Sequence, residues 1–254
     1  MVIRKLDVKL LRDLVRMRGQ VLAIMVVIAS GVATFVMAMC AYASLAWSKD
    51  YFYREFRFAD IFAEARRVPD YIEPRIRELP GVAAVETRMV YDVLLDIPSM
   101  KEPASARLIS IPETRDLVLN QIYISRGRML EPQRTGEVVI SEVFADAHGF
   151  VAGDTLRAII NGKSQQLKIV GVALSPEYVI QVQPGSIVPD EKRFGVFWMN
   201  ERDLEAALDM TGAFNSVAIK LAYEGDAAEV VDAPDELLEP YGRGGDYGRD
   251  EQLS

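Results

Sequence analysis

Residues 21–47 read VLAIMVVIASGVATFVMAMCAYASLAW, and this stretch decides how the chain is organised. No charged residue occurs between Gly19 and Ser48, and a helix over residues 21–47 would be about 40 Å long. The hydrocarbon core of a bilayer needs only about 20 apolar residues, so the stretch is long enough to span a membrane with some tilt. We therefore predict an uncleaved transmembrane helix over residues 20–47.

Three other interpretations of this stretch stay open. Ala41-Tyr42-Ala43 has the small-x-small form of a cleavage site, and cleavage after Ala43 would release a secreted binding protein. The apolar region of a signal peptide is typically about 7–15 residues long, however, and this one is far longer. A lipoprotein signal centred on Cys40 is disfavoured because Met39 stands where a small residue is expected. A buried core helix would rarely lack polar residues over such a length.

The charges before the span predict its orientation. Residues 1–20 hold six basic residues against two acidic ones, a net charge of +4, whereas the whole chain carries −8. Positive charge close to a span keeps that side in the cytoplasm, so the chain after Trp47 is expected outside.

A helical pattern over residues 1–19 separates Ile3, Leu6, Leu10, Leu14 and Met17 from Lys5, Lys9, Arg12 and Arg16. This predicts a cytoplasmic amphipathic helix lying on anionic headgroups, and the alternative is a charge cluster that only sets topology.

Two sets of residues are candidate contacts of the span. Small side chains one helical turn apart are typical of helix–helix packing in lipid, and they predict such a face at Ala29, Ser30, Ala33 and Thr34. Directly after the span, aromatic rings suit the headgroup zone and predict a membrane-interface collar at Tyr51, Phe52, Tyr53 and Phe56.

Residues 48–222 mix strand and helix signals without repeating βαβ units, which predicts an α+β extracytoplasmic domain. Asn161-Gly162 is a strong hairpin signal, and Gly149 is expected to end a helix. Strands are expected over 60–66, 82–97, 106–111, 136–141, 155–160, 165–172, 194–199 and 215–221, and helices over 69–79, 142–148 and 201–210.

No motif points to catalysis, a cofactor or a metal, so we name no catalytic, cofactor-binding or metal-binding residue and expect no enzyme. One cysteine and one histidine, His148, exclude a disulfide framework and a multi-cysteine zinc site. The net charge of −8 argues against general nucleic-acid binding. Gly162-Lys163-Ser164 lacks the earlier glycine of a phosphate loop and is interpreted as a turn.

Other polar features are interpreted in the same way. Ser175-Pro176-Glu177-Tyr178 is expected to form a turn after a strand, because no base accompanies the serine. Asp190-Glu191 and Asp235-Glu236 are interpreted as solvated loop charges, and the glycines of residues 241–248 as a flexible tail rather than a dinucleotide loop.

A resemblance rests on motifs that follow the span in a fixed order, namely Gly127-Arg128 with Glu131, Gly136-Glu137-Val138-Val139-Ile140-Ser141, Gly149, Gly153-Asp154 and Lys168-Ile169-Val170-Gly171-Val172. With the N-terminal span, this order resembles MacB/FtsX-type ABC-transporter permeases over roughly residues 8–222. The resemblance implies a MacB-like periplasmic core domain that has a porter-like lobe and an inserted, mostly β lobe, expected near residues 105–175. It also implies a bacterial inner (plasma) membrane location.

The resemblance implies a non-catalytic permease component that couples ATP hydrolysis by a partner to movements of the outer domain. The implied partners are a cytoplasmic ABC ATPase subunit, further permease helices, membrane lipids and a second copy in a dimeric assembly. Residues 223–254 are acidic, contain no long apolar run and are expected to form a polar tail, so the chain is expected to be an N-terminal fragment or split subunit. The alternative is a single-pass anchored binding or scaffold protein that works without ATP.

Overall fold

The computed structural model describes residues 15–98, 102–183, 188–222 and 237–248, together with Lys9, Arg12, Met100 and Ser186. The side chains of residues 49, 50, 52, 54 and 243–248 are outside this description. Most of the amphipathic helix expected over residues 1–19 therefore lies outside the described residues. The chain divides into two units, residues 1–52 and residues 53–254, and each is considered by itself below.

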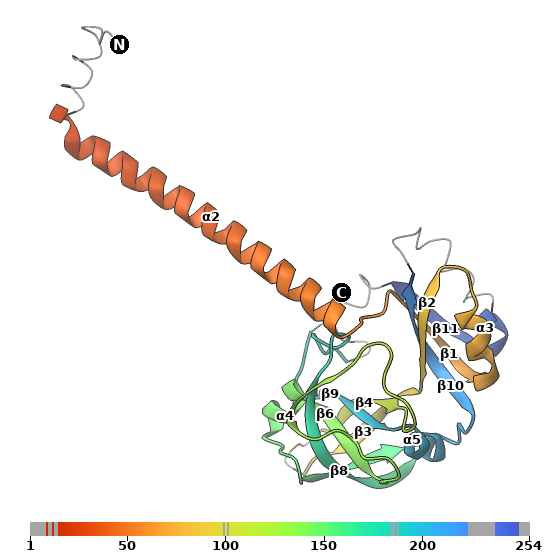
Figure 1. Ribbon diagram of the computed structural model, residues 1–254. Coiled ribbons are helices and arrows are strands. Elements are labelled where there is room, and N and C mark those ends of the chain that lie inside the picture. Colours follow the sequence, from red (N-terminus) through yellow and green to blue (C-terminus); the bar gives the residue numbers. More distant parts are fainter. Residues whose placement is uncertain are drawn as a thin grey trace. The chain divides into compact units, whose positions relative to one another are not determined.

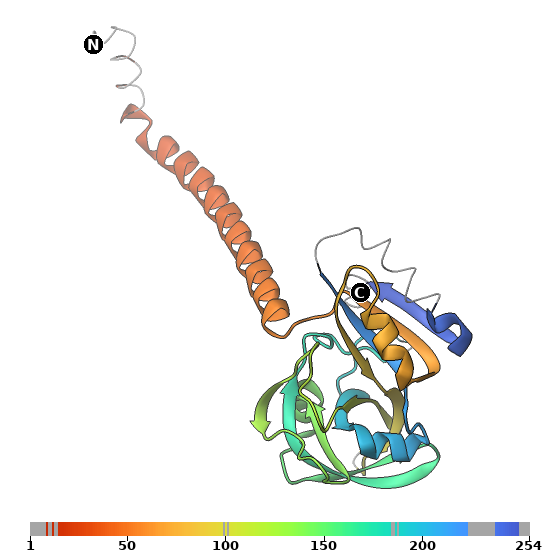
Figure 2. The ribbon, with the colours of Figure 1, turned by 45° about the vertical axis from the view of Figure 1, so that its right-hand side comes forward.

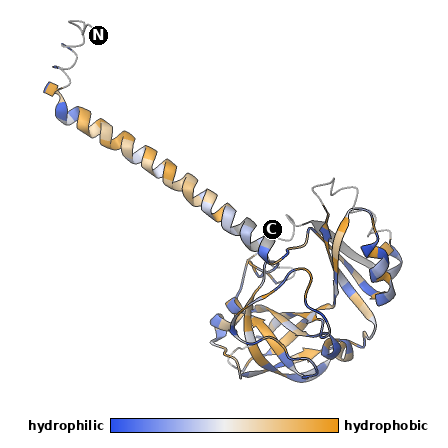
Figure 3. Cartoon of the chain, viewed as in Figure 1, coloured by the Kyte–Doolittle hydropathy of each residue, from blue (hydrophilic) through white to orange (hydrophobic). Residues whose placement is uncertain are grey.

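The first unit contains most of helix α2 (Arg18–Glu55). No proline occurs before Pro69, so nothing interrupts the backbone hydrogen bonds of this helix. Residues 18–48 are long and apolar enough to cross a membrane, and Figure 3 shows this helix mostly in the colour of hydrophobic residues. Most of its large apolar side chains are exposed. The helix expected over residues 20–47 is confirmed as a helix, and it continues to Glu55, so that it includes every expected collar residue except Phe56.

The second unit contains two sheets, which Figure 1 shows as two lobes. The first lobe is an antiparallel sheet in the order β11-β1-β10-β2, built from β1 (Ile61–Pro69), β2 (Val82–Arg88), β10 (Ala213–Leu221) and β11 (Arg243–Gly248). The helical segments η1 (Asp70–Ile72), α3 (Glu73–Arg77) and η2 (Glu239–Tyr241) accompany this sheet. Ile72 and Ile76 are buried with Val68, Val85 and Val217 in its core.

The second lobe is a sheet that closes on itself. Its order is β5-β8-β6-β9-β4-β3-β7, and β7 also pairs with β8, so six strands form a ring to which β5 is added. Strands alternate inward and outward side chains, and the inward ones fill the ring as a core of residues such as Leu108, Ile140 and Phe197. The strands are β3 (Val90–Asp96), β4 (Ala104–Ile111), β5 (Tyr123–Gly127), β6 (Glu137–Ser141), β7 (Thr155–Ile160), β8 (Lys163–Leu174) and β9 (Phe194–Asn200). The helices are α4 (Glu142–His148) and α5 (Glu201–Leu208).

The second lobe is inserted between two neighbouring strands of the first. The chain leaves the first lobe after β2 and returns in β10, and β2 and β10 are hydrogen-bonded to each other (Figure 2). The side chain of Asn215 accepts from the Val90 amide and donates to the Val90 carbonyl, both at 2.8 Å, which fixes the point of exit. The α+β class and the inserted β lobe are confirmed, but the insertion covers residues 90–208 rather than 105–175.

Local signals predicted most elements well. Asn161 (φ 48°) and Gly162 (φ 73°) make the expected hairpin turn, and Gly149 (φ 70°) ends α4 as expected. Two expectations were wrong. Strand β5 has no counterpart among the expected strands, and residues 243–248, interpreted as flexible tail, form β11 and pair with β1. Residues 237–242 of the expected tail are also ordered, with η2 and the buried Leu238, and residues 223–236 and 249–254 lie outside the described residues.

Candidate functional site

The residues considered for conventional chemistry lie apart from one another. Among the described residues, no group of three His, Cys, Asp or Glu side chains is placed to hold a metal ion. The ring of the half-buried His148 packs against Phe144, and its Nε2 atom lies 2.9 Å from the Lys192 carbonyl oxygen. Gly162-Lys163-Ser164 belongs to the β7–β8 hairpin, and Asp190 accepts hydrogen bonds from the amides of residues 192 and 193 within its own loop. Asp235-Glu236 lies outside the described residues.

The chain leaves α2 through a well-defined helix stop. Arg57 adopts the left-handed conformation with φ 48°, and the Phe58 amide donates to the Tyr53 carbonyl at 2.8 Å. The rings of Tyr53 and Phe58 stack with their centroids 4.7 Å apart. A reversed bond of this kind with an apolar contact across it is the Schellman motif, here with Arg57 in the position that glycine usually occupies. The direction of the chain after α2 is therefore set by specific contacts.

A loop of the inserted lobe holds this exit segment. The amides of Asn120 and Gln121 donate to the carbonyls of Arg57 and Phe56 at 3.2 and 3.0 Å. The Ala59 amide donates to the Asn120 Oδ1 atom at 2.9 Å. We call residues 118–121 the clasp. Because Leu119 and Phe58 are both buried in one small apolar cluster, the clasp and the exit segment also share a core.

The clasp is tied to both lobes by buried acidic residues. Glu86 on β2 accepts from the amides of Val118 and Leu119 at 2.7 and 3.4 Å and binds Arg115 at 2.5 Å. Glu177, which follows β8, accepts from Asn120 Nδ2 at 2.9 Å. Glu86 belongs to the first lobe and Glu177 to the inserted lobe, so the clasp connects both to the exit of α2.

Glu177 also joins the lobes directly. Its two carboxylate oxygens accept from the two Nη atoms of Arg88 on β2, and both side chains are buried. The Arg88 Nε atom donates to Ser216 on β10 at 3.3 Å, and the guanidinium lies 5.6 Å from the Phe62 ring centroid on β1. A buried charge is tolerated only when it is paired and hydrogen-bonded, and these contacts supply both conditions.

A second polar contact holds the other side of the exit segment. Lys220 Nζ donates to the Phe58 carbonyl at 2.9 Å and to Asp60 at 3.0 Å, and the second Asp60 oxygen accepts from the Leu221 amide. Burial lowers the pKa of Lys220, because a charged ammonium loses hydration there. Residues 56–60 are thus bound by the clasp on one side and by β10 on the other.

The predicted collar residues are placed differently from one another. Tyr51 is exposed, and the side chain of Phe52 lies outside the description. Tyr53 stacks on Phe58, and Phe56 meets the ring of Tyr123 edge-on at 6.3 Å. Tyr53 and Phe56 therefore contact other side chains of the second unit.

The predicted packing face lies along α2. Ala29, Ser30, Ala33 and Thr34 are all exposed. The hydroxyls of Ser30 and Thr34 donate to the carbonyls of Val27 and Ser30 within the helix, at 2.8 and 2.9 Å. Both donors are thereby satisfied without a partner helix.

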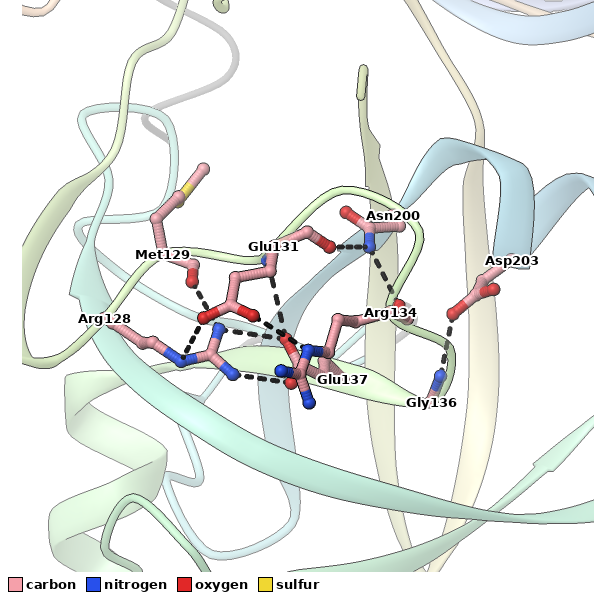
Figure 4. A network of polar contacts seen from close by, with 8 residues as sticks. All are labelled: Arg128, Met129, Glu131, Arg134, Gly136, Glu137, Asn200 and Asp203. Atoms are coloured by element: carbon pink, nitrogen blue, oxygen red, sulfur yellow. Dashed lines mark hydrogen bonds and ion pairs between the residues drawn. The ribbon is translucent and has the colours of Figure 1, made fainter. Parts of the chain in front are cut away.

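A second polar network explains the motif at residues 127–137 (Figure 4). Arg128 binds both oxygens of the buried Glu137 side chain, and its guanidinium holds the pKa of that carboxyl below its usual range. Asn200 donates to the carbonyls of Glu131 and Arg134, and the Gly136 amide donates to Asp203. These contacts fix the loop between β5 and β6, and the motif is structural.

Gly127 and Gly171 of this motif are paired across β5 and β8, and their backbones lie very close together. A Cβ atom on Gly127 would lie 2.4 Å from the Val170 carbonyl oxygen, and one on Gly171 would lie 2.2 Å from the Arg128 carbonyl oxygen. Only glycine allows the backbones of β5 and β8 to approach so closely.

Sequence reasoning missed the residues that matter most at the junction. The sequence pattern predicted only a turn at Glu177. That turn is present, because the Glu177 amide donates to Ser175 Oγ at 3.2 Å. Arg88 and Asn120 were not singled out at all. The one available signal was the Glu177 carboxylate at the start of an otherwise uncharged stretch, residues 178–189.

Comparisons with known proteins gave matches among solved structures alone. No protein-family model matches the chain, and no curated protein matches it. The extracellular domain of the ABC-type transporter YknZ from Gram-positive bacteria matches with a TM-score of 0.47 and 12% identity, over 72% of this chain and 92% of that one. The periplasmic region of MacB from Actinobacillus actinomycetemcomitans matches with a TM-score of 0.47 and 10% identity, over 78% of this chain and 92% of that one.

Proposed function

We propose that this chain is a non-catalytic, membrane-anchored permease component of an ABC transporter, in which movements of the α2 helix reposition the outer domain. The observation that carries the proposal is the clasp. The segment leaving the apolar helix is hydrogen-bonded to residues 118–121, which Glu86 and Glu177 bind from the two lobes. A simple anchor would need no such contacts, whereas here the segment that follows the helix is bound by residues of both lobes.

The proposed arrangement completes what the sequence resemblance implies. The N-terminus lies in the cytoplasm, the domain lies outside the bacterial plasma membrane, and an ATPase partner with further permease helices drives the motion. Ala29, Ser30, Ala33 and Thr34 form the face of α2 that packs against those helices or against a second copy, since small residues allow close approach in lipid.

The experiment is amide hydrogen exchange of the outer domain in native membrane complexes that retain a bound ATPase. Adding ATP should change the exchange of residues 118–121 and 175–181 in the wild type. The Asn120→Ala and Glu177→Gln variants should lose this response while the exchange of β9 stays native. Glu137→Gln is the control, because it alters a second glutamate–arginine pair in which the glutamate is buried, away from the junction.

If ATP leaves the wild-type outer domain unchanged, the coupling role is refuted, and the chain acts as an anchored scaffold that works without ATP. A response that survives in both junction variants would refute the clasp as the route of coupling.

A further inference from the structure

The loop after Glu177 carries apolar side chains outward in a fixed arrangement. Val179 is 55% exposed and Ile180 is 64% exposed. They lie between two buried anchors, because Glu177 binds Arg88 and Asn120, and the Gln181 side chain accepts from Ser141 Oγ at 2.9 Å. We call Val179 and Ile180 the apolar arch. Because Glu177 and Gln181 on either side of the arch are buried, the fold fixes Val179 and Ile180 at the surface of the domain.

The sequence around the arch is unusual for this chain. Residues 178–189 contain no charged side chain, although 26% of all residues are charged, which would give about three in a run of that length. Val188 in the same loop is 64% exposed. An exposed apolar surface without charges commonly marks contact with another apolar phase or molecule.

The arch and the exit of α2 share one corner of the domain. Asn120 donates through its backbone amide to Arg57 and through its side chain to Glu177, two residues before the arch. On the same side, Tyr123 contacts the Phe56 ring and pairs across the sheet with Leu174, and both Tyr123 and Leu174 are exposed.

The length of chain between this corner and the apolar segment sets an upper limit on their separation. Ser48 ends the segment able to cross a membrane, and Phe56 follows eight residues later, which in a helix is about 12 Å. The headgroup region extends roughly 5–8 Å beyond the hydrocarbon core on each side. The chain that links the apolar segment to the exit of α2 is therefore short on the scale of the headgroup region.

We propose that the apolar arch inserts into the headgroup region of the bilayer that α2 crosses, as a second lipid contact of the outer domain. Two points of contact, α2 and the arch, would hold the orientation of the inserted lobe relative to the membrane surface. This inference rests on the proposed membrane span. A lipid surface suits the arch because its two aliphatic side chains stand in a stretch of sequence without charge, which matches an interface rather than a specific protein partner.

The test is fluorescence of the full chain in lipid vesicles with one labelled cysteine at a time. An environment-sensitive dye is placed on Ile180→Cys in a Cys40→Ala background. Val151→Cys in the same background is the matched control, because Val151 is 56% exposed on the same lobe. Native Cys40 in the wild type reports the span separately. Quenching is measured with lipids that carry a nitroxide close to the headgroup or deep in the acyl chain.

We expect the dye at position 180 to shift its emission to shorter wavelength and to lose intensity with the shallow quencher, while the dye at position 151 does neither. The dye on Cys40 should be quenched by the deep quencher. Quenching at Cys40 without quenching at 180 would refute the arch contact and leave the span intact. A shifted but unquenched dye at 180 would assign the arch to a protein partner and also refute it, as would equal quenching at 180 and 151. An unquenched Cys40 would refute the span and the arch contact together.

Discussion

Arg88 and Glu177 are 89 residues apart in the chain and form a buried ion pair with two hydrogen bonds, of 2.5 and 2.6 Å. Arg88 ends β2 in the first lobe, and Glu177 follows β8 in the inserted lobe. The same carboxylate receives the side chain of Asn120, which also holds the exit of α2. One carboxylate thus joins the two lobes and, through Asn120, the segment that leaves α2.

Removing one partner of this pair should destabilise the outer domain strongly. Arg88→Met leaves the Glu177 charge buried without its counter-ion, which typically costs about 3–5 kcal/mol of unfolding free energy. Urea unfolding of the full chain in detergent, followed by the fluorescence of the buried Trp198, measures the change.

The control for this prediction is Arg193→Ala. Arg193 pairs with the exposed Glu102 and Asp190, and exposed pairs contribute at most about 1 kcal/mol. Equal effects of Arg88→Met and Arg193→Ala would contradict a structural role for the buried pair.

The contact between Gly127 and Gly171 predicts a severe effect of a single methyl group. Gly127→Ala would place its Cβ 2.4 Å from a carbonyl oxygen of β8, and backbone atoms cannot move aside as a flexible side chain could. We expect a loss of about 3 kcal/mol or more from overpacking added to backbone strain.

Gly149→Ala separates these two contributions, because Gly149 has a similar φ of 70° but nothing within 4 Å of the new Cβ. That variant should lose only about 1–2 kcal/mol, the strain of the left-handed backbone. Thermal unfolding of both variants checks the difference, and a Gly127→Ala protein as stable as Gly149→Ala would show that β5 and β8 are not so close.

Acidification should remove the contribution of the Glu137–Arg128 pair to stability. The Arg128 hydrogen bonds lower the pKa of Glu137 from its ordinary value of 4.5. A lowered carboxyl pKa in the folded state means that the stabilisation is fully present above pH 4.5 and is lost as the pH falls through the folded-state value. The advantage of the wild type over Glu137→Gln, measured by urea unfolding across a pH series, should therefore shrink below about pH 4.5.

Arg128→Gln tests the cause of this pH dependence. Because Arg128 is the main source of the lowered pKa, this variant should show the same reduced pH dependence as Glu137→Gln. If the Arg128→Gln variant kept the wild-type pH dependence of stability, another group would be responsible for that dependence. Burial raises the pKa of the neighbouring Asp203, which works in the opposite direction, so the comparison between variants is more informative than the wild-type curve alone.

Cysteine accessibility should report the orientation of the span. A cysteine at the exposed position Ser164, with Cys40→Ala, should react with a membrane-impermeant maleimide in cells whose outer membrane, where present, has been permeabilised. A cysteine at Leu6 should react only after the inner membrane is opened, since the six basic residues before the span favour a cytoplasmic N-terminus. The reverse labelling pattern would contradict the proposed topology.

The sequence by itself determined the features that depend on neighbouring residues. The apolar run of residues 21–47 has no charge to solvate and no proline to break it, so it specifies a long helix. Asn161-Gly162 and Gly149 favour positive φ, so they specify a hairpin and a helix end wherever the chain goes next. The mixed strand and helix pattern of residues 48–222 likewise indicated an α+β domain.

Only the tertiary structure decided which distant residues meet. β11 is rich in glycine, and it forms a strand because the edge of β1 offers hydrogen bonds to it. Asn120, Glu177 and Arg88 lack any local pattern. They come together because the ring of the inserted lobe closes through β7 and β8, and because that lobe leaves and re-enters the first lobe through the neighbouring strands β2 and β10. A buried charge has to find its partner across that closed topology, and no spacing along the chain encodes the pairing.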